Sequence, residues 1–389
     1  MELTAIYHRP ESEYAYLYKD GQLHIRIRTK KEDIKRIVLH YGDPFIFIED
    51  LYEATKEMDK VTTDDLFDYW QVSVSVRHAR IQYLFELEDR AGEKILYGDR
   101  GVVAYTKENL DFVMNGFKLP FIHEIDGCAV PDWVAQTVWY QIFPERFANG
   151  NPAISPEGVR PWDASIAPQI LDFFGGDLQG IIDHLDYLQE LGITGLYLCP
   201  IFESPSNHKY DTIDYFKIDQ HFGDKETFRK LVKEAHARGM KIMLDAVFNH
   251  IGYDSPQWQD LVKHGEDSIY KDWFHISFDG NSCYDDGFWY EGWEGHFELV
   301  KLNLQNPAVV DYLMECVKYW IDEFDIDGLR LDVAYSLDHN FMRRLRSYTQ
   351  ELKPDFALIG EVLFGDYNII VNDEMLHSCT NYECYKGLY

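Results

Sequence analysis

The chain has 389 residues, which exceeds one ordinary domain and predicts two domains, one of them carrying an insertion. Its 67 Asp and Glu outnumber 37 Lys and Arg, and the formal net charge of −30 repels nucleic-acid phosphates and anionic lipid, which argues against nucleic-acid binding. The first residues lack the apolar core of a signal peptide and no later stretch has the apolar length of a membrane span, so we expect a cytoplasmic protein.

Short alternating apolar and polar runs, separated by turn residues, occupy residues 5–103 and predict an antiparallel β-sandwich. We assign residues 1–125 to this N-terminal domain. Residues 118–133 are irregular and punctuated by proline, which is typical of a linker. The six cysteines are scattered without CxxC pairs and predict neither a zinc site nor a disulfide framework.

Residues 126–389 alternate buried strands with amphipathic helices. We expect strands at 138–143, 195–202, 241–247, 327–333, 357–362 and near 377–382, and helices at 178–191, 224–238, 306–324 and 338–353. This alternation requires parallel strands covered by helices, in either an open doubly wound sheet or a closed (β/α)8 barrel.

An aromatic, glycine-rich insertion at 251–303 follows the third strand of this series and is too long for an ordinary loop. We interpret it as a small functional domain. Its Trp289, Tyr290 and Trp293 have two interpretations, a wall for substrate or a small packed core.

Polar side chains stand where three of the expected strands end: Asp245 with Asn249 and His250, then Arg330 with Asp332, then Glu361. In a parallel α/β barrel these ends form the catalytic face. Asp332 and Glu361 are separated by one strand–helix–strand unit, so their carboxyls are expected at equivalent levels on adjacent strands, within about 5 to 5.5 Å. At that separation one carboxyl can attack a sugar carbon while the other serves the leaving oxygen, so the geometry predicts retention of configuration.

Two roles can be assigned to this carboxylate pair. Arg330, two residues before Asp332 and on the same strand face, can hold Asp332 ionised as a nucleophile. Glu361 would need a raised pKa to protonate the leaving oxygen. The alternative is that strand-end carboxylates only cap helices or pair with arginine, and three such ends together argue against it.

Three segments, DAVFNH at 245–250, GLRLDVA at 328–334 and GEV at 360–362, resemble the first three signature regions of the α-amylase family of glycoside hydrolases. VWYQIFPERFANGN, FFGGDLQGI, SPSNHKYDTIDY, HFGD and the KLN at 301–303 are similar to its neopullulanase, cyclomaltodextrinase and maltogenic amylase branch. AIYHRP near the start resembles that branch's starch-binding-like N-terminal sandwich. The resemblance implies a (β/α)8 TIM-type barrel, of which about six strands are present.

The same resemblance implies roles for single residues. Asp332 would be the nucleophile and Glu361 the general acid/base, with Arg330 and His250 holding the sugar at the cleavage subsite. Tyr210 would stack under that sugar and Asp245 would orient Arg330. The structural alternatives are that Tyr210 only packs in the core and that His250 is a buried imidazole whose hydrogen bonds are all made within the protein.

The resemblance also implies a calcium ion and a partner. The calcium positions of this branch match Asn149, Asn151, Ser155, Gly175 and Asp177. Their oxygens are suitable hard ligands, although a turn-rich loop that needs these residues for its backbone is the alternative. A homodimer formed through the N-terminal domain is implied as well.

Two departures from the branch bear on function. Where its members usually read VANE, this chain reads Val333-Ala334-Tyr335-Ser336, beside the leaving-group subsites, which favours linear α-1,4 chains. The family's third carboxylate has no counterpart before Tyr389, so we expect a fragment of a longer protein with impaired hydrolysis.

The predicted function is hydrolysis of α-1,4 bonds in maltodextrins, starch, cyclodextrins or pullulan through a covalent glycosyl-enzyme. The alternatives are a transglycosylase that uses the same site and a non-catalytic glucan-binding protein.

Overall fold

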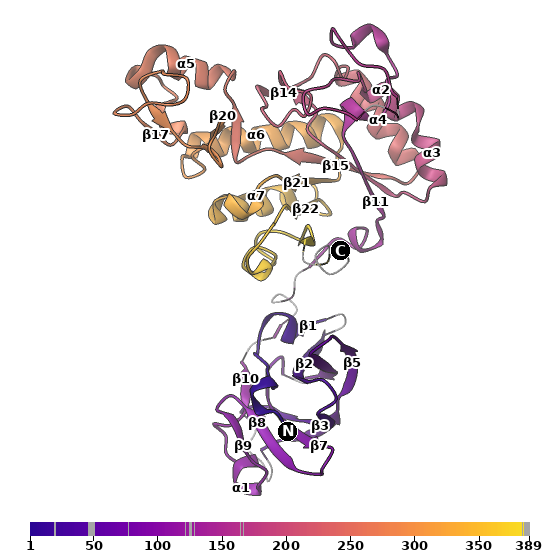
Figure 1. Cartoon of the computed structure of the whole chain (residues 1–389), viewed down its shortest axis with the longest axis vertical. Coiled ribbons are helices and arrows are strands. Elements are labelled where there is room, and N and C mark those ends of the chain that lie inside the picture. Colours follow the sequence, from indigo (N-terminus) through magenta and orange to yellow (C-terminus); the bar gives the residue numbers. More distant parts are fainter. Residues whose placement is uncertain are drawn as a thin grey trace. The chain divides into compact units, whose positions relative to one another are not determined.

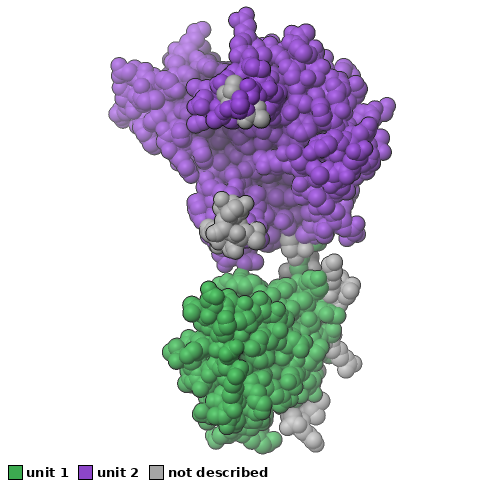
Figure 2. Space-filling model, turned by 45° about the vertical axis from the view of Figure 1, so that its right-hand side comes forward, with its two compact units in different colours: residues 1–129 green, residues 130–389 purple. Residues whose placement is uncertain are grey.

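The computed structural model describes residues 1–18, 21–45, 51–76, 78–120, 122–123, 127, 129–163, 165, 167–382 and 384. The chain forms two compact units, Met1–Ala129 and Val130–Tyr389 (Figure 2). The domain boundary expected between residues 125 and 126 falls outside the described residues.

The first unit contains two antiparallel sheets that share one core (Figure 1). One sheet has the order β1 (Ala15–Leu17), β2 (Gln22–Lys30), β6 (Phe67–Ser75), β5 (Asp59–Thr63). The other has the order β4 (Ala54–Glu57), β3 (Ile34–Gly42), β7 (Ile81–Asp89), β8 (Lys94–Gly98), β9 (Gly101–Ala104). Alternate residues of β2 and β6 face residues of β3 and β7 across this core, which confirms the predicted sandwich.

One part of the expected linker belongs to this sandwich. Phe117–Leu119 form β10, which pairs antiparallel with β7, because Phe117 is an apolar anchor in the shared core. The prediction that residues 118 and 119 are irregular is therefore wrong. A single short helix turn, α1 (Lys107–Leu110), precedes this strand and is capped by Thr106.

The second unit is built around a parallel sheet of six strands (Figure 1). Their order is β11 (Trp139–Ile142), β12 (Gly195–Leu198), β15 (Lys241–Ala246), β21 (Gly328–Leu331), β22 (Ala357–Gly360), β23 (Ser378–Cys379). Spatial order follows chain order without the reversal that defines a doubly wound sheet, so the strands belong to a barrel-type sheet. Each of the six lies within a predicted strand region.

Three helices that connect these strands begin where the sequence predicts, each after a capping side chain. α4 (Lys225–Ala237) is capped by Asp224, α6 (Pro307–Phe324) by Asn306 and α7 (His339–Leu352) by Asp338, each side chain accepting a main-chain N–H of the first turn. Their buried faces join the strands in one hydrophobic core.

The helix expected at 178–191 is two short helices, α2 (Leu178–Asp183) and α3 (Leu185–Glu190). His184 breaks it, because its ring Nδ1 donates to the Gly180 carbonyl at 2.8 Å, where a continuous helix would use the main-chain N–H. That N–H bonds to Ile181 instead. The expectation of one continuous helix is therefore wrong.

The insertion has small sheets of its own beside the parallel sheet. β16 (His250–Gly252) pairs with β20 (His296–Lys301), which also pairs with β19 (Gly292–Trp293), while β17 (Ile276–Ser277) pairs with β18 (Trp289–Tyr290). Helix α5 (Pro256–His264) supplies Trp258, which packs on Tyr290 at 4.4 Å between ring centroids. A separate hairpin of β13 (Phe202–Glu203) and β14 (Asp214–Ile218) lies between β12 and α4 in the chain.

Among the described residues, no helix combines the length and apolar character that crossing a membrane requires. Within the same residues the five cysteines carry free thiols.

Just before β21, at the edge of the sheet opposite the strand ends that carry Asp332 and Glu361, one buried carboxylate gathers three basic side chains. Asp327 is 2.7 Å from His236 Nε2, 3.0 Å from Lys241 Nζ and 3.2 Å from Lys353 Nζ. Burial alone would raise the pKa of Asp327, but the bonds from His236, the Ile242 N–H and the lysines outweigh it and hold that pKa well below 3.8.

We expect Asp327→Asn to lower the free energy of unfolding by about 3–5 kcal/mol at pH 7, because the basic groups lose a buried counter-ion. The folded pKa is depressed, so this stabilisation is complete above the unfolded pKa of 3.8 and is lost as pH falls through the folded value. Urea unfolding at pH 7 and at pH 3 measures both effects. Asp322→Asn, which removes an exposed partner of Lys318, is the matched control and should cost far less. Equal losses for the two variants, or a loss independent of pH, would contradict the assignment.

Candidate active site

The strand register brings the predicted catalytic residues to one edge of the sheet. Asp245 on β15 lies opposite Arg330 on β21, and Leu331 lies opposite Gly360 on β22. Asp332 and Glu361 directly follow that second pair, so they leave adjacent strands at the same level.

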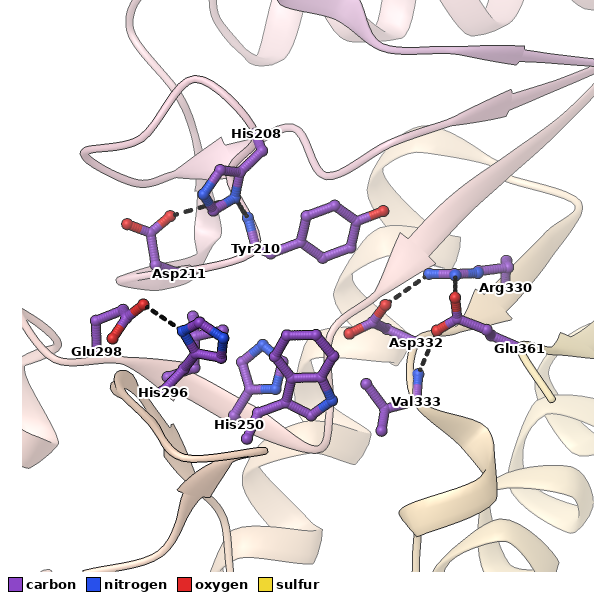
Figure 3. Close-up of a pocket in the computed structure, with 12 residues that line it drawn as sticks. His208, Tyr210, Asp211, His250, His296, Glu298, Arg330, Asp332, Val333 and Glu361 are labelled. Atoms are coloured by element: carbon purple, nitrogen blue, oxygen red, sulfur yellow. Dashed lines mark hydrogen bonds and ion pairs between the residues drawn. The ribbon is translucent and has the colours of Figure 1, made fainter. Parts of the chain in front are cut away.

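One guanidinium connects the three carboxylates at this edge, and Figure 3 shows its bonds to Asp332 and Glu361. Arg330 Nη1 donates to Asp245 Oδ1 at 2.8 Å and to Asp332 Oδ1 at 2.7 Å. Arg330 Nη2 lies 2.8 Å from Glu361 Oε1. Because two nitrogens of one fork hold Asp332 and Glu361, the two carboxyls face the same small volume.

Asp245 holds the Arg330 guanidinium from the buried side of the site. Its second oxygen accepts the hydroxyls of Tyr197 at 2.6 Å and Tyr210 at 2.8 Å, and its side chain is fully buried. These bonds hold Asp245, which in turn holds Arg330. The sequence interpretation missed Tyr197, which lies within a predicted strand and whose ring is indistinguishable from core packing in a linear sequence.

The turn after Asp332 supplies a contact that the sequence did not indicate. Val333 N–H donates to Glu361 Oε2 at 3.0 Å (Figure 3). Val333 is buried and has φ of 51°, a left-handed conformation that is costly for a β-branched residue, by about 1–3 kcal/mol. The strained backbone thus aims an amide at the second oxygen of Glu361, while Tyr382 Oη lies 3.5 Å from the first.

The charge balance at this edge differs from the expectation that Arg330 holds Asp332 in its ionised form. Burial raises the pKa of Asp332 well above its usual value, the nearby Asp245 carboxylate adds to the rise, and Arg330 opposes both. The ion pair with Arg330 exists, but its charge is shared among three carboxylates, so it does not outweigh burial.

A cavity of about 410 Å³ opens above these groups. It is lined by His208, Tyr210, Asp211, His250, Trp293, His296, Glu298, Leu299, Arg330, Asp332, Val333 and Glu361. Figure 3 shows the Arg330 cluster at one side and His208, Asp211, His296 and Glu298 at the other. Its size and its mixture of rings and charged groups are those of a small-molecule site.

His250 is held as a neutral ring in this cavity. Burial lowers the pKa of His250 to about 4, partly opposed by the main chain of Tyr210. The Asn249 amide contacts Nδ1 at 3.2 Å, and among the described residues Nε2 makes no hydrogen bond of acceptable distance and angle. A neutral ring whose Nδ1 accepts from Asn249 carries its proton on Nε2, where it can donate to a ligand.

The three aromatic residues of the insertion for which two interpretations were open have different surroundings. Trp293 lines the cavity and stacks on His296, with centroids 5.5 Å apart and planes at 21°. Tyr290 is fully buried against Trp258, and Trp289 is 46% exposed. Both interpretations therefore apply, with Trp293 in the wall and Tyr290 in a small packed core.

The residues that match the calcium positions lie close together beside α2. Asn149 Nδ2 donates to Ser155 Oγ at 2.9 Å, and a Cβ on Gly175 would lie 2.7 Å from each of these two atoms. Asp177 accepts the main-chain N–H groups of Gly150 and Asn151, at 3.2 and 2.7 Å, and also caps α2. The Asn151 side chain instead accepts the N–H of Ala153.

The donor set fits a hard cation in part. Asn149 Oδ1 is buried without a hydrogen-bond partner among the described residues, as is Glu145 Oε2, and Glu145 Oε1 accepts the Gly175 N–H. Both orphaned atoms are oxygens of the type that calcium prefers. Against this, the carboxylate of Asp177 is already satisfied by main-chain N–H groups.

Comparisons with known proteins agree with this geometry. Residues 141–373 match the family described as alpha amylase, catalytic domain, and residues 1–123 match the alpha amylase, N-terminal ig-like domain. The chain is 49% identical over 384 residues to the intracellular maltogenic amylase of Bacillus subtilis (strain 168), covering 98% of this chain and 64% of that protein. It is 50% identical over 368 residues to a cyclomaltodextrinase of Geobacillus thermopakistaniensis (strain MAS1), covering 93% and 61%.

A solved cyclomaltodextrinase structure superimposes with a TM-score of 0.88 at 41% identity, covering 98% of this chain and 64% of that one. The chain thus spans about two thirds or less of the length of these relatives. The predicted resemblance is confirmed, and the chain belongs to the alpha-amylase family.

Proposed function

We propose that the protein carrying this chain is a retaining glycoside hydrolase that cleaves α-1,4 bonds of maltodextrins, starch, cyclodextrins or pullulan. The observation that carries the proposal is the pair Asp332 and Glu361, held at one level by a single guanidinium at the wall of a 410 Å³ cavity. Relatives named maltogenic amylase, cyclomaltodextrinase and neopullulanase support the substrate class.

In the proposed reaction, a carboxylate oxygen of Asp332 bonds to the anomeric carbon while Glu361 gives its proton to the departing glycosidic oxygen. Arg330 binds Oδ1 of Asp332, and we assign the attack to Oδ2. Glu361 then takes a proton from water, whose oxygen displaces Asp332 and restores the original anomeric configuration. The Val333 N–H keeps Glu361 oriented for both steps.

Other cavity residues are assigned to sugar binding. The ring of Tyr210 borders the cavity while its hydroxyl is fixed on Asp245, so its face is presented in one orientation. His250 would donate from Nε2 to a sugar hydroxyl, and Arg330 has a role in binding as well as in orientation. Asp245 acts through Arg330 and is a positioning residue.

The nucleophile assignment predicts that Asp332→Asn lowers kcat on maltoheptaose and β-cyclodextrin by about 10⁴-fold or more, because no covalent intermediate can form. For the unsubstituted enzyme, NMR of the newly formed reducing ends should show the α anomer first. Asp322→Asn, an exposed substitution on the outer helix α6, is the control and should retain activity. An active Asp332→Asn enzyme would remove Asp332 from the mechanism, and β products would remove retention.

We also propose calcium at Asn149, Ser155, Gly175 and Asp177, with Asn151 contributing through its main chain. Calcium at a hundredfold excess over Kd should stabilise the fold by about 2.7 kcal/mol relative to EDTA, which raises Tm. Asn149→Ala should abolish this difference, whereas Asn109→Ala in the other unit should preserve it. An identical Tm in calcium and in EDTA would dismiss the site.

Two further expectations are kept as proposals, namely cytoplasmic location and a homodimer formed through the N-terminal unit. A relative that is named intracellular supports the first. Sedimentation velocity of the protein, with and without residues 1–129, measures the second, and a monomer at micromolar concentration would contradict it.

A further inference from the structure

One buried lysine beside the cavity has no part in the reaction proposed above. Lys209 lies in the loop of residues 204–213 between β13 and β14, and its side chain is only 2% exposed. A lysine is almost never buried to this extent unless a partner takes its charge. Its two neighbours in the chain, His208 and Tyr210, both line the cavity (Figure 3). Lys209 is therefore placed where its own contacts can affect two cavity residues.

The ammonium of Lys209 connects this loop to the base of its hairpin. Nζ lies 2.8 Å from Asp219 Oδ2 and donates to the Ser204 carbonyl at 2.9 Å. Ser204 directly follows β13, Asp219 directly follows β14, and the Ser204 N–H donates to the same Asp219 oxygen at 3.2 Å. Both charges are almost fully buried, so removal of either partner would leave the other uncompensated.

The main chain of Lys209 is held in an unfavourable conformation. Its φ is 63°, in the left-handed region, where the Cβ of an L-residue is crowded. Its N–H donates to Ser206 Oγ at 3.0 Å, and its carbonyl accepts the Thr212 hydroxyl at 3.0 Å. Such a conformation persists only where the surroundings fix it, and here the ammonium and both main-chain groups of one residue are bonded.

This anchored residue determines how the next ring is presented. The Tyr210 N–H donates to His208 Nδ1 at 3.1 Å, and the two ring centroids are 5.9 Å apart. At its other end, Tyr210 donates its hydroxyl to Asp245 at 2.8 Å. The Tyr210 ring is thus held between Asp245 and the main chain that leaves Lys209. A shift of that main chain, with the hydroxyl still bound to Asp245, would tilt the ring.

We propose that Lys209 is a positioning residue, whose buried ammonium holds the loop so that Tyr210 presents its ring to the sugar at the bond to be broken. The inference rests on the proposed function and adds to it a residue that does not contact the substrate. Lys209 acts through Tyr210, whose ring must lie at the right distance and angle to cover the sugar face. Asp219 is the partner that keeps the ammonium in place.

Two substrates and a matched lysine variant test this role. Lys209→Met keeps an unbranched side chain and loses the ammonium. We expect it to lower kcat/KM of the folded enzyme by about 10- to 100-fold for both maltoheptaose and α-maltosyl fluoride, because both place a sugar at the bond to be broken. Lys217→Met removes an exposed ion pair with Glu203 from the same hairpin and should stay within about twofold of the parent. Parent-like values for Lys209→Met, or a loss confined to maltoheptaose, would overturn the proposal.

A variant that destabilises the fold elsewhere separates positioning from stability. Asp327→Asn acts at the opposite edge of the parallel sheet, so its Tm should fall while kcat/KM of its folded enzyme stays within about twofold of the parent. Thermal melting sets an assay temperature at which every variant is folded. If Asp327→Asn lost as much kcat/KM as Lys209→Met, the loss would follow stability and positioning would be wrong.

Lys209→Gly separates the ammonium from the main chain. Glycine adopts a φ of 63° without strain, so this variant favours the native backbone and lacks the anchoring side chain. We expect a loss of kcat/KM at least as large as that of Lys209→Met. Parent-like kcat/KM would show that the backbone conformation suffices, and the ammonium would then have no positioning role.

Asp219→Asn tests the pair from the other side and carries the test if the Lys209 variants do not fold. It keeps an oxygen acceptor without the charge, and we expect about a tenfold loss of kcat/KM with both substrates. Combined with Lys209→Met it should add little, because both changes break one contact. Losses that multiply, or a parent-like Asp219→Asn, would overturn the pair. Failure of the proposed function looks different, since Asp332→Asn would then hydrolyse both substrates as the parent does.

Discussion

The arrangement of the candidate active site depends on one guanidinium that is shared by three carboxylates. Arg330 contacts Asp245, Asp332 and Glu361 at 2.7 to 2.8 Å, and the strand register makes this sharing possible by setting Arg330 opposite Asp245. One positive charge cannot neutralise three negative ones in a buried site, so burial raises the pKa of Asp332. In the proposed reaction, unbalanced negative potential there would favour the oxocarbenium-like transition state, in which the sugar itself becomes cationic.

At the opposite edge of the same sheet, the numbers of acidic and basic groups are reversed. Asp327 is one carboxylate surrounded by His236, Lys241 and Lys353, and its pKa is held below the ordinary value where that of Asp332 is raised. Asp327 directly precedes strand β21 and Asp332 directly follows it, so the four residues of that strand separate them. Asp327, before the strand, is therefore stabilised as a charged group by its basic neighbours, whereas burial destabilises the charged form of Asp332 after the strand. In a barrel, the carboxyl ends of the strands carry the functional groups and the opposite ends contribute to stability.

Local patterns were sufficient to predict the strands of the sheet, the starts of helices α4, α6 and α7, and the strand ends that carry Arg330 and Glu361. Each of these depends on residues close together in the sequence. The contacts that were missed depend on partners far apart. The break at His184 requires a ring that competes with the helix for a carbonyl, and its sequence still reads as a continuous apolar stripe. Tyr197 becomes a site residue only because β12 pairs with β15, which brings its hydroxyl to Asp245. The linear sequence alone does not distinguish Tyr197 from a tyrosine of the hydrophobic core.

The turn after Asp332 shows why the remainder could not be read from sequence. A valine gives no hint of a left-handed backbone, yet the φ of 51° at Val333 turns its N–H toward Glu361 and sends Tyr335 toward Glu294. The backbone bond orients the proposed acid, while the side-chain bond ties the turn to the hairpin bearing Trp293. The surrounding core must supply the energy for this strain, and it does so through strands and helices whose apolar residues are packed beneath the site. The segment from Asp332 to Tyr335, in which Val333 has the left-handed backbone, therefore links the hairpin that carries Trp293 to the main-chain N–H that binds Glu361.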